Sequence, residues 1–329
     1  MSLPRKPSRR ALLKDAFAAA TLLWPAGRAV TAMAAQPDSA SPTTAPAEPI
    51  IDIHQHTHYS GRTDEQLINH QRRMGATLTF LLPAGTYVER AATHDGKSNG
   101  LAAKCGTNES CRSLAAAHPD EYRFFANDTP DLPTAAAEIK RYLKLGAIGI
   151  GEQKFNVECD GPEMQAIFEI ADEFHVPVLM HFQHGMYNKG FERFGKVLDK
   201  YPKVNFIGHA QTFWTNIDKN PADPKVLYPK TKVTSGGLTD QYLSDHPNLL
   251  ADMSAGSGLN ALTRDEDHAH GFLDRHQDQL LFGSDCNDTA GRGPTCSGWM
   301  QIRAIRRMAP TKAIERKILY ENARRVFRL

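Results

Sequence analysis

The chain carries two histidines at alternate positions directly after a short apolar run. The segment "IIDIHQHTHYS" spans residues 50–60 and places His54 and His56 two residues apart. Alternate side chains of an extended strand point to the same side, so both imidazoles would project together from a strand end. Neutral imidazoles placed in this way bind a divalent metal well, whereas a polar strand end is the simpler interpretation of an isolated HxH. His58 continues the alternation, but the Tyr-Ser-Gly after it indicates a loop, so we expect it to line a pocket rather than bind a metal.

Four further apolar runs end in side chains of the same kind. These run ends are Glu152, His181, His209 and Asp285. Imidazole nitrogens and carboxylate oxygens are the usual protein ligands of zinc and similar ions. Such side chains at the ends of five separate runs are hard to obtain by chance, so we predict a shared divalent-metal site. Zinc is the first choice and manganese the alternative, and the number of ions, one or two, stays open.

These runs belong to a regular alternation of short apolar segments and longer amphipathic ones. Eight candidate strands lie at residues 50–54, 77–82, 122–127, 147–152, 177–182, 204–209, 249–254 and 280–285. Segments with the apolar spacing of helices separate them, among them 64–74, 132–145, 162–174 and 264–276. Strands that alternate with helices predict a parallel sheet, and the first strand lacks the GxGxxG of a dinucleotide-binding fold. Eight units in about 280 residues predict an α/β fold of the (β/α)8 TIM-barrel type, whose functional side chains gather at the C-terminal ends of the strands.

Several of these run ends lie in recognisable motifs. "DIHQH" at 52–56, "MHF" at 180–182, "GH" at 208–209 and "FGSD" at 282–285 resemble the amidohydrolase superfamily. "LLFGSDCND" and the closing "NARRVFRL" resemble its amidohydrolase-related branch, which holds metal-dependent hydrolases, lactonases and non-oxidative decarboxylases. The resemblance runs from residue 50 to the end of the chain, and its motifs are fairly specific for the superfamily but do not identify a substrate.

The resemblance implies roles for the residues that match its motifs. His54 and His56 would bind the buried metal, and Asp285 would bind it and take a proton from the metal-bound water. His181 and His209 would complete one or two metal sites.

The fourth strand departs from the common pattern of the superfamily. Glu152 stands where a modified lysine commonly bridges two metals, and it resembles a variant of some deoxyribonuclease-type relatives. Lys154 has the same strand parity as Glu152, so it is either the bridging residue or a substrate contact.

Three functions compete for this set of residues. The first is a metal-dependent hydrolase that attacks the carbonyl of an ester, lactone or amide, with Asp285, His209 and Lys154 as its catalytic residues. The second is a non-oxidative decarboxylase or hydratase of an aromatic or unsaturated acid on the same site. The third is a non-catalytic protein that binds a metal or another ligand. We favour the hydrolase.

Three residues in the segments after the strands are candidate substrate contacts. Gln183 follows the fifth strand and would donate a hydrogen bond to a substrate oxygen, and Trp214 follows the sixth and would line a pocket. Arg264 is a candidate carboxylate clamp, with an ion pair to a neighbouring carboxylate as the alternative.

The first 35 residues have the parts of an export signal. Arg9 and Arg10 precede a short apolar run and a small-residue exit, which resembles a twin-arginine signal peptide and predicts a periplasmic protein. A retained N-terminal anchor is the alternative. Residues 36–49 are rich in Pro, Ser, Thr and Ala and predict a disordered linker, so the metal-dependent hydrolase domain is expected at 50–329.

Charge and composition limit the partners of the chain. The 329 residues are 41% hydrophobic and carry a formal net charge of +2, with no basic run in the body of the sequence. These features indicate a globular protein that binds a small molecule and neither nucleic acid nor, after cleavage of the signal, a membrane. A homo-oligomer is compatible with a barrel, because its outer helices often pair.

Five cysteines remain to be placed. Cys105 and Cys111, and likewise Cys286 and Cys296, flank short Gly-containing loops. Two local disulfides are one interpretation in an exported protein, and thiols in or near loops are the other. None of the cysteines has the CxxC spacing of a zinc site.

Overall fold

The computed structural model describes residues 48–86, 100–101 and 105–329. The predicted signal peptide and all but the last two residues of the predicted linker lie outside the described residues. In the described part, each of the eight predicted runs overlaps a strand: β1 (Ile51–Gln55), β2 (Leu78–Leu81), β3 (Tyr122–Phe124), β4 (Ile150–Gln153), β5 (Val178–His181), β6 (Phe206–His209), β7 (Leu249–Asp252) and β8 (Leu280–Leu281).

The strands close into one parallel barrel. They pair in the order β1-β2-β3 and β4-β5-β6-β7-β8, and every pair is parallel. A parallel bridge between Ala126 and Ile150 joins β3 to β4. The backbone N–H of Ile53 donates to the carbonyl of Phe282 at 3.1 Å and joins β1 to β8. The prediction of a (β/α)8 TIM barrel is therefore confirmed.

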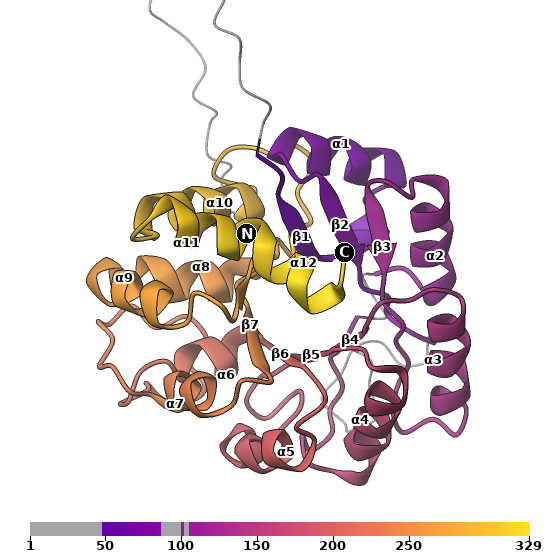
Figure 1. Cartoon of the computed structure of the whole chain (residues 1–329), viewed down its shortest axis with the longest axis horizontal. Helices are drawn as coiled ribbons and strands as arrows, with labels where there is room; N and C mark the ends of the chain where they lie inside the picture. Colours follow the sequence, from indigo (N-terminus) through magenta and orange to yellow (C-terminus); the bar gives the residue numbers. More distant parts are fainter. Residues whose placement is uncertain (1–47, 87–99, 102–104) are drawn as a thin grey trace, which may run out of the picture. The chain divides into compact units, whose positions relative to one another are not determined.

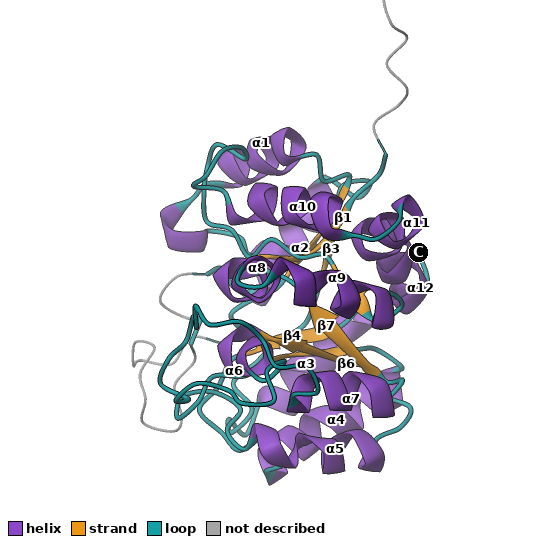
Figure 2. Ribbon diagram, turned by 90° about the vertical axis from the view of Figure 1, so that its left-hand side faces the viewer, coloured by secondary structure: helices purple, strands orange, loops and turns teal. Residues whose placement is uncertain are grey.

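Helices surround the ring of strands (Figure 1). They are α1 (Asp64–Met74), α2 (Asn108–Ala117), α3 (Ala135–Lys144), α4 (Pro162–Phe174), α5 (Phe194–Lys200), α6 (Ala210–Thr215), α7 (Leu238–Asp245), α8 (Ala255–Thr263), α9 (Glu266–Arg275), α10 (Ser297–Met308), α11 (Lys312–Arg316) and α12 (Asn322–Phe327). Short single turns add η1 (Tyr59–Gly61), η2 (Phe191–Arg193) and η3 (Lys317–Glu321). In the perpendicular view the long loops and helix α12 lie at opposite ends of the barrel (Figure 2). No helix of the described ranges is long and apolar enough to span a membrane.

Local signals explain why the helices begin and end where they do. Helix α1 starts after a capping box, in which Thr63 accepts from the N–H of Gln66 and the Gln66 side chain accepts from the N–H of Thr63. It stops at Gly75, whose φ of 100° is the left-handed conformation that glycine adopts without strain. Helix α4 starts with Pro162, whose fixed φ suits the first helical position.

Apolar side chains fill the barrel interior. One buried cluster takes side chains from seven of the eight strands or the residues next to them, and from α12: Ile51, Ile53, Phe80, Leu82, Phe125, Leu179, Ile207, Leu250, Leu281, Ala323 and Phe327. Helix α12 lies across the N-terminal end of the barrel (Figure 1), and the ring of its Phe327 packs 4.6 Å from that of Phe80. Gly149 makes room for this packing, since a Cβ there would lie 2.6 Å from the Phe125 ring. This apolar plug leaves only the C-terminal end of the barrel for polar chemistry.

The eighth strand is shorter than its apolar run predicted. It covers Leu280–Leu281, although the run extends to residue 285. The chain turns toward the neighbouring strand end, where a Cβ on Gly283 would lie 2.4 Å from the Asp252 carboxylate. This close approach places Asp285, whose φ is 41°, at the C-terminal end of the barrel.

A buried charge cluster on the outer helices gives a first prediction. Asp240 accepts from His276 Nε2 at 2.6 Å and from Arg275 Nη2 at 3.0 Å. Burial alone would raise the pKa of Asp240, but His276, Arg275 and the N–H of Gly236 lower it to about 2. We expect Asp240→Asn to lower the free energy of unfolding by roughly 2 kcal/mol at neutral pH.

The sign of the pH dependence follows from the lowered pKa. The stabilisation is present above the ordinary carboxyl pKa of about 3.9 and is lost as pH falls toward about 2. Urea unfolding of both proteins at neutral pH and near pH 3 measures the difference. The largely exposed pair between Lys232 and Asp267 provides the control, because Asp267→Asn should change stability little at either pH. A pH-independent difference for Asp240→Asn would contradict the assignment.

Candidate metal centre

Five polar side chains converge at the C-terminal ends of the strands. They are His54 and His56 from β1 and its end, Glu152 from β4, His209 from β6, and Asp285 after β8. Ligand atoms of His54, His56 and Asp285 lie within 4.8 Å of one another, as do those of His54, Glu152 and His209. The histidine and glutamate side chains are at most 1% exposed, whereas Asp285 is 11% exposed. Asp285 is thus the member of this set that is open to a substrate.

His54 and His56 point the same ring nitrogen, Nε2, toward each other. His54 Nδ1 donates to Asp252 Oδ2 at 2.6 Å, and His56 Nδ1 donates to the carbonyl of Leu82 at 2.7 Å. A carboxylate and a carbonyl only accept hydrogen bonds, so these contacts fix the proton on Nδ1 of each neutral ring. Both Nε2 atoms then present a lone pair across 3.2 Å. A cation between them removes this repulsion.

The carboxylates complete an electronegative cavity. Glu152 Oε2 lies 3.5 Å from both Nε2 atoms, and Asp285 Oδ1 lies 3.5 Å from His56 Nε2 and 3.9 Å from His54 Nε2. These two oxygens are buried and accept no hydrogen bond. Burial alone would lower the pKa of His54, but Asp285 and Asp252 raise it to about 10, so without an ion Nε2 also carries a proton, which a bound metal would replace. The cavity therefore favours positive charge, and its unpaired oxygens and facing nitrogens fit a divalent ion.

His209 enters the same cavity from the opposite side. Its Nδ1 contacts Ser254 Oγ at 3.0 Å, and its Nε2 lies 3.7 Å from Glu152 Oε1 and 3.8 Å from Asp285 Oδ2. Its ring centroid is 4.7 Å from that of His54. The structure therefore brings His209 to the predicted site.

Lys154 places a fixed cation at the edge of the site. It follows β4 directly, and its Nζ lies 5.8 Å from the centroid of the Tyr187 ring. Burial alone would lower the pKa of Lys154, but Glu152 and then Asp285 raise it. The ammonium is thus charged and faces the carboxylates of the cavity.

His181 positions Glu152 instead of joining the converging nitrogens. Its Nδ1 lies 2.5 Å from Glu152 Oε1, and its Nε2 faces Gln183 Oε1 at 3.4 Å. Burial and the charge of Lys154 lower the pKa of His181 to about 4, so the ring is neutral and donates from Nδ1. The described geometry makes His181 a hydrogen-bond partner of Glu152, a candidate ligand, and its own role as a metal ligand stays a prediction. Gln183 lies beside it, and a role in substrate binding stays a prediction.

Two predicted substrate contacts lie elsewhere in the fold. Trp214 is 2% exposed, donates from Nε1 to the carbonyl of Asp252 at 2.9 Å, and packs against Phe213. It was expected in a loop, but the short helix α6 turns its ring into the core, so the prediction that it lines a pocket is wrong.

Arg264 follows the last residue of α8 and faces the charges of Asp218 and Asp265. Asp218 and Asp265 do not belong to the five side chains that converge at the candidate metal centre. Its Nε and Nη2 atoms are buried without a hydrogen-bond partner among the described residues, so the substrate clamp and the ion pair both stay predictions.

His58 also lies outside the cavity. It has a left-handed φ of 55°, a side chain that is 55% exposed, and an Nε2 atom 3.7 Å from Asp64 Oδ1. The alternation of β1 has ended at this point, so His58 points to solvent rather than to a pocket wall.

Several residues of the site were not singled out from the sequence. Asp252 and Ser254 at the end of β7 hold His54 and His209, and the Asp252 carboxylate lies 3.2 Å from His209 Nδ1. Tyr59 lies against Asp285, which with burial raises the pKa of its phenol. Asp252 ends an apolar run as the recognised ligands do, so its position in the sequence was a usable signal.

The contact between Asp252 and His54 gives a second prediction. Replacement of Asp252 by Asn removes the charged acceptor that holds the His54 ring and its tautomer. We expect metal affinity to fall about 10- to 100-fold, because partners of metal-bound histidines have effects of this size. Competition with a chelator measures the affinity. Asp240→Asn is the matched control, since it removes a buried aspartate of another Asp–His pair, and equal affinities in the two variants would contradict the role of Asp252.

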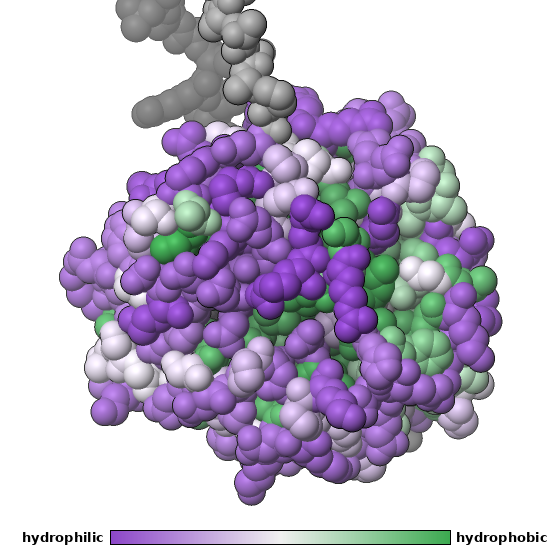
Figure 3. Space-filling view, in the orientation of Figure 1, coloured by the Kyte–Doolittle hydropathy of each residue, from purple (hydrophilic) through white to green (hydrophobic). Residues whose placement is uncertain are grey.

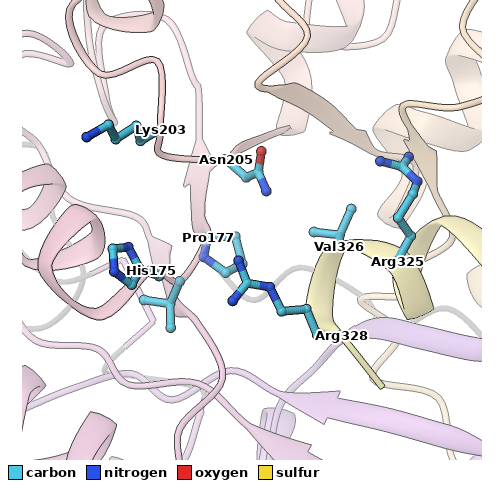
Figure 4. A pocket seen from close by; sticks show the side chains of 8 residues that line it. His175, Pro177, Lys203, Asn205, Arg325, Val326 and Arg328 are labelled. Carbon is cyan, nitrogen blue, oxygen red and sulfur yellow. The ribbon is translucent and has the colours of Figure 1, made fainter.

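A basic pocket lies at the other end of the barrel. It has a volume of about 460 Å³ and is lined by His175, Val176, Pro177, Lys203, Asn205, Arg325, Val326 and Arg328. These residues precede β5 and β6 or belong to α12 and the residue after it (Figure 4). The face of the protein that carries α12 is largely hydrophilic (Figure 3). The metal ligands follow the strands, so this pocket is separate from the candidate metal centre.

Comparison with known proteins identifies relatives of the fold. A family model described as amidohydrolase (amidohydrolase 2) matches residues 51–329. No curated protein matches the sequence. A TIM-barrel protein of Bordetella bronchiseptica has a TM-score of 0.58 at 15% identity, over 85% of this chain and 99% of that one.

Two further solved structures share the fold. The 2,6-dihydroxybenzoate decarboxylase of Rhizobium has a TM-score of 0.52 at 15% identity, over 85% of this chain and 99% of its own. A probable 2-pyrone-4,6-dicarboxylic acid hydrolase of Acinetobacter baumannii has a TM-score of 0.51 at 13% identity, over 85% and 99%. At sequence identities this low, the similarity shows only that these proteins share a fold.

Proposed function

This chain belongs to the amidohydrolase family, whose members are metal-dependent enzymes, and we propose that it hydrolyses a carbonyl compound of small size. The observation that carries the proposal is the convergence of the two Nε2 atoms of His54 and His56 with the unpaired buried oxygens of Glu152 and Asp285. Asp285 is the partly open member of this set, so one of its sides can reach a substrate.

We propose a single ion at this centre. Both ligand groups include His54, and its Nδ1 already donates to Asp252, so only Nε2 is left to bind a metal. His54, His56 and Asp285 would hold the ion, with Glu152 and His209 next to it. When bound, a divalent ion would acidify water and polarise a carbonyl oxygen. Zinc suits the imidazole and carboxylate donors, and manganese is the alternative, since a dihydroxybenzoic acid decarboxylase of the same fold holds manganese.

The side chains supply the proton transfer and the orientation. Burial alone would raise the pKa of Asp285, but His54 and His56 lower it to about 2, so its carboxylate is ready to accept a proton at neutral pH. Asp285 would take the proton of the attacking water and pass it to the leaving group. His209 lies 3.8 Å from Asp285 Oδ2 and would hydrogen-bond the polarised oxygen. Lys154 would orient an anionic group of the substrate.

A decarboxylase is the second candidate, and Lys154 is the observation that favours it. Removal of carbon dioxide requires a carboxylate held in place, and a half-buried ammonium at the edge of the cavity suits that task. Three solved decarboxylases share the fold, acting by their names on 2,6-dihydroxybenzoate, 5-carboxyvanillate and dihydroxybenzoic acid. Arg62 is excluded as a further clamp, since its guanidinium donates to the carbonyls of Cys286 and Asp288.

Reaction in ¹⁸O-labelled water separates the two functions. The metal-loaded protein is offered a panel of lactones, esters and amides and a panel of hydroxylated aromatic acids. Hydrolysis places ¹⁸O in the product carboxyl group, whereas decarboxylation releases carbon dioxide and leaves no label in the ring product. Carbon dioxide release without label in any carboxyl product would replace the hydrolase by the decarboxylase. No reaction with either panel in the metal-loaded protein would favour the non-catalytic alternative.

The role of Lys154 gives a third prediction. Lys154→Met keeps much of the length of the side chain but removes its charge. We expect KM for a substrate with a free carboxylate to rise about 10-fold or more, while KM for its neutral analogue changes little. Steady-state kinetics with both substrates measures the contrast. Lys189→Met removes a surface lysine that pairs with Glu158 at 3.2 Å and should change neither value. Equal changes for both substrates would show that Lys154 does not bind the carboxylate.

We further propose that the enzyme acts in the periplasm on a small molecule. The support is the sequence of residues 1–35, with Arg9 and Arg10 ahead of the apolar run. Replacement of both arginines by lysine should keep the full-length chain in the cytoplasm, as cell fractionation would detect. Unchanged export of the doubly substituted chain would contradict this route.

A further inference from the structure

A second set of metal-ligating side chains lies outside the catalytic cavity. One ligand atom each of His70, Cys286, Asp288 and Cys296 lies within 4.8 Å of the other three. His70 and Cys296 are fully buried, Cys286 is 3% exposed, and the Asp288 side chain is 14% exposed. The proposed reaction uses none of these side chains.

The distances between the two sulfurs and between sulfur and His70 match the edges of a tetrahedral metal site, whereas Asp288 lies somewhat farther away. The two sulfurs are 3.7 Å apart, His70 Nε2 is 3.3 Å from Cys296 Sγ, and His70 Nε2 is 3.9 Å from Asp288 Oδ2. Zinc bonds of about 2.3 Å to sulfur and about 2.0 Å to nitrogen in a tetrahedron place two sulfurs about 3.8 Å apart, and sulfur and nitrogen about 3.5 Å apart. A disulfide requires the sulfurs at about 2.05 Å. No disulfide joins any of the five cysteines, all of which are described.

We propose that His70, Cys286 and Cys296 bind a thiophilic divalent ion of the zinc type, with Asp288 at the fourth position. Two thiolates and an imidazole from a buried site are the donor set of a structural zinc centre. Asp288 is the weakest of the four ligands, because its Oδ2 already accepts from the N–H groups of Ala290 and Gly291 at 2.9 and 2.8 Å.

The surrounding contacts hold the sulfur ligands in place. Cys296 caps helix α10, where its Sγ accepts from the N–H of Trp299 at 3.3 Å. Arg62 donates to the carbonyls of Cys286 and Asp288 at 2.8 and 3.0 Å.

The bound ion would tie together three segments of the fold. His70 belongs to α1, Cys286 and Asp288 to the loop after β8, and Cys296 to the start of α10. Gly291 of this loop packs so close to α1 that a Cβ there would lie 2.4 Å from the carbonyl of His70. Cys286 follows Asp285 directly, so the ion would anchor the segment that carries the proposed proton acceptor.

X-ray absorption at the zinc edge tests the site on the unmodified full chain. The protein is purified without chelator and loaded with zinc alone. We expect a shell of sulfur neighbours at about 2.3 Å, in addition to the nitrogen and oxygen neighbours of the catalytic ion. The Cys286→Ser/Cys296→Ser double variant should lose this shell and about one equivalent of zinc.

Controls separate this site from the catalytic centre. His54→Ala should lose the catalytic ion and keep the sulfur shell, so the two proposals can fail independently. Cys159→Ser removes another buried cysteine, which donates to the carbonyl of Gly190 at 3.1 Å, and should keep both ions. Cys105→Ser tests the thiol beside His56 and should also keep the sulfur shell.

Two results would overturn the proposal. The first is the absence of sulfur neighbours in the zinc-loaded protein, which decides the question even when the double variant does not fold. The second is a mass lower by two hydrogens for a peptide pair that links Cys286 to Cys296 after alkylation without reduction. That result would show a disulfide in place of the ion.

Discussion

Replacement of Asp285 by Asn is expected to lower kcat about 1000-fold, because a positioned proton acceptor contributes about 10²- to 10⁴-fold to catalysis. The amide keeps the shape and one oxygen ligand but cannot accept a proton. Asp285 is 11% exposed, and His54 and His56 lower its pKa to about 2, so the native side chain is both accessible and ionised. KM should change little, because the substrate gains most of this interaction in the transition state.

The measurement requires kinetics normalised to bound metal, because Asp285 is also a proposed ligand. The metal content of each preparation is determined first, and kcat is then expressed per ion at the catalytic centre. Asp267→Asn is the matched control, since it removes one carboxylate that is 93% exposed and should leave kcat unchanged. A kcat per ion within about threefold of the wild-type value would show that another group accepts the proton.

His54→Ala is expected to abolish binding of the catalytic ion and, with it, the activity. His54 belongs to both groups of converging ligands, so its loss leaves neither group with three ligands. The variant also removes the partner that Asp252 Oδ2 contacts at 2.6 Å. With chelator present for both proteins, we expect the free energy of unfolding to fall by roughly 3 kcal/mol, the cost of an unpaired buried charge.

The alternating histidines of β1 supply their own control. His56→Ala should also lose the catalytic ion, whereas His58→Ala should keep it, because His58 is 55% exposed and lies outside the cavity. Metal analysis and urea unfolding of the three variants measure both effects. Equal metal content in the His54 and His58 variants would remove the assignment of the centre.

Much of the architecture is encoded in short-range patterns. Each of the eight predicted apolar runs overlaps a strand, and α1 and α4 coincide with the predicted helical segments 64–74 and 162–174. Backbone geometry explains this success, since hydrophobic periodicity and capping residues act within one or two turns. The positions of Glu152, His209 and Asp285 followed as well, because a parallel barrel brings the C-terminal ends of its strands to one face.

Contacts between segments far apart in the chain could not be predicted from the sequence. Asp252 holds His54 across 198 residues, and Cys296 meets His70 across 226. The helix α6 turns Trp214 inward, although its place after a strand indicated a pocket wall. Such pairs depend on how helices pack against the barrel, which no local pattern specifies.

The direction in which His54 and His56 point shows most clearly what the sequence determined and what the tertiary structure decided. Composition and spacing determined that His54 and His56 would project together from a strand end. If side chains simply alternated along β1, the two histidines would lie on the face opposite to Ile51 and Ile53, whose side chains point into the barrel. The structure has a register shift between Asp52 and Gln55, after which the histidines also point inward. The sequence thus determined the fold and indicated the candidate ligands, whereas only the closed barrel, with its irregular strand end, decided that these residues face one cavity.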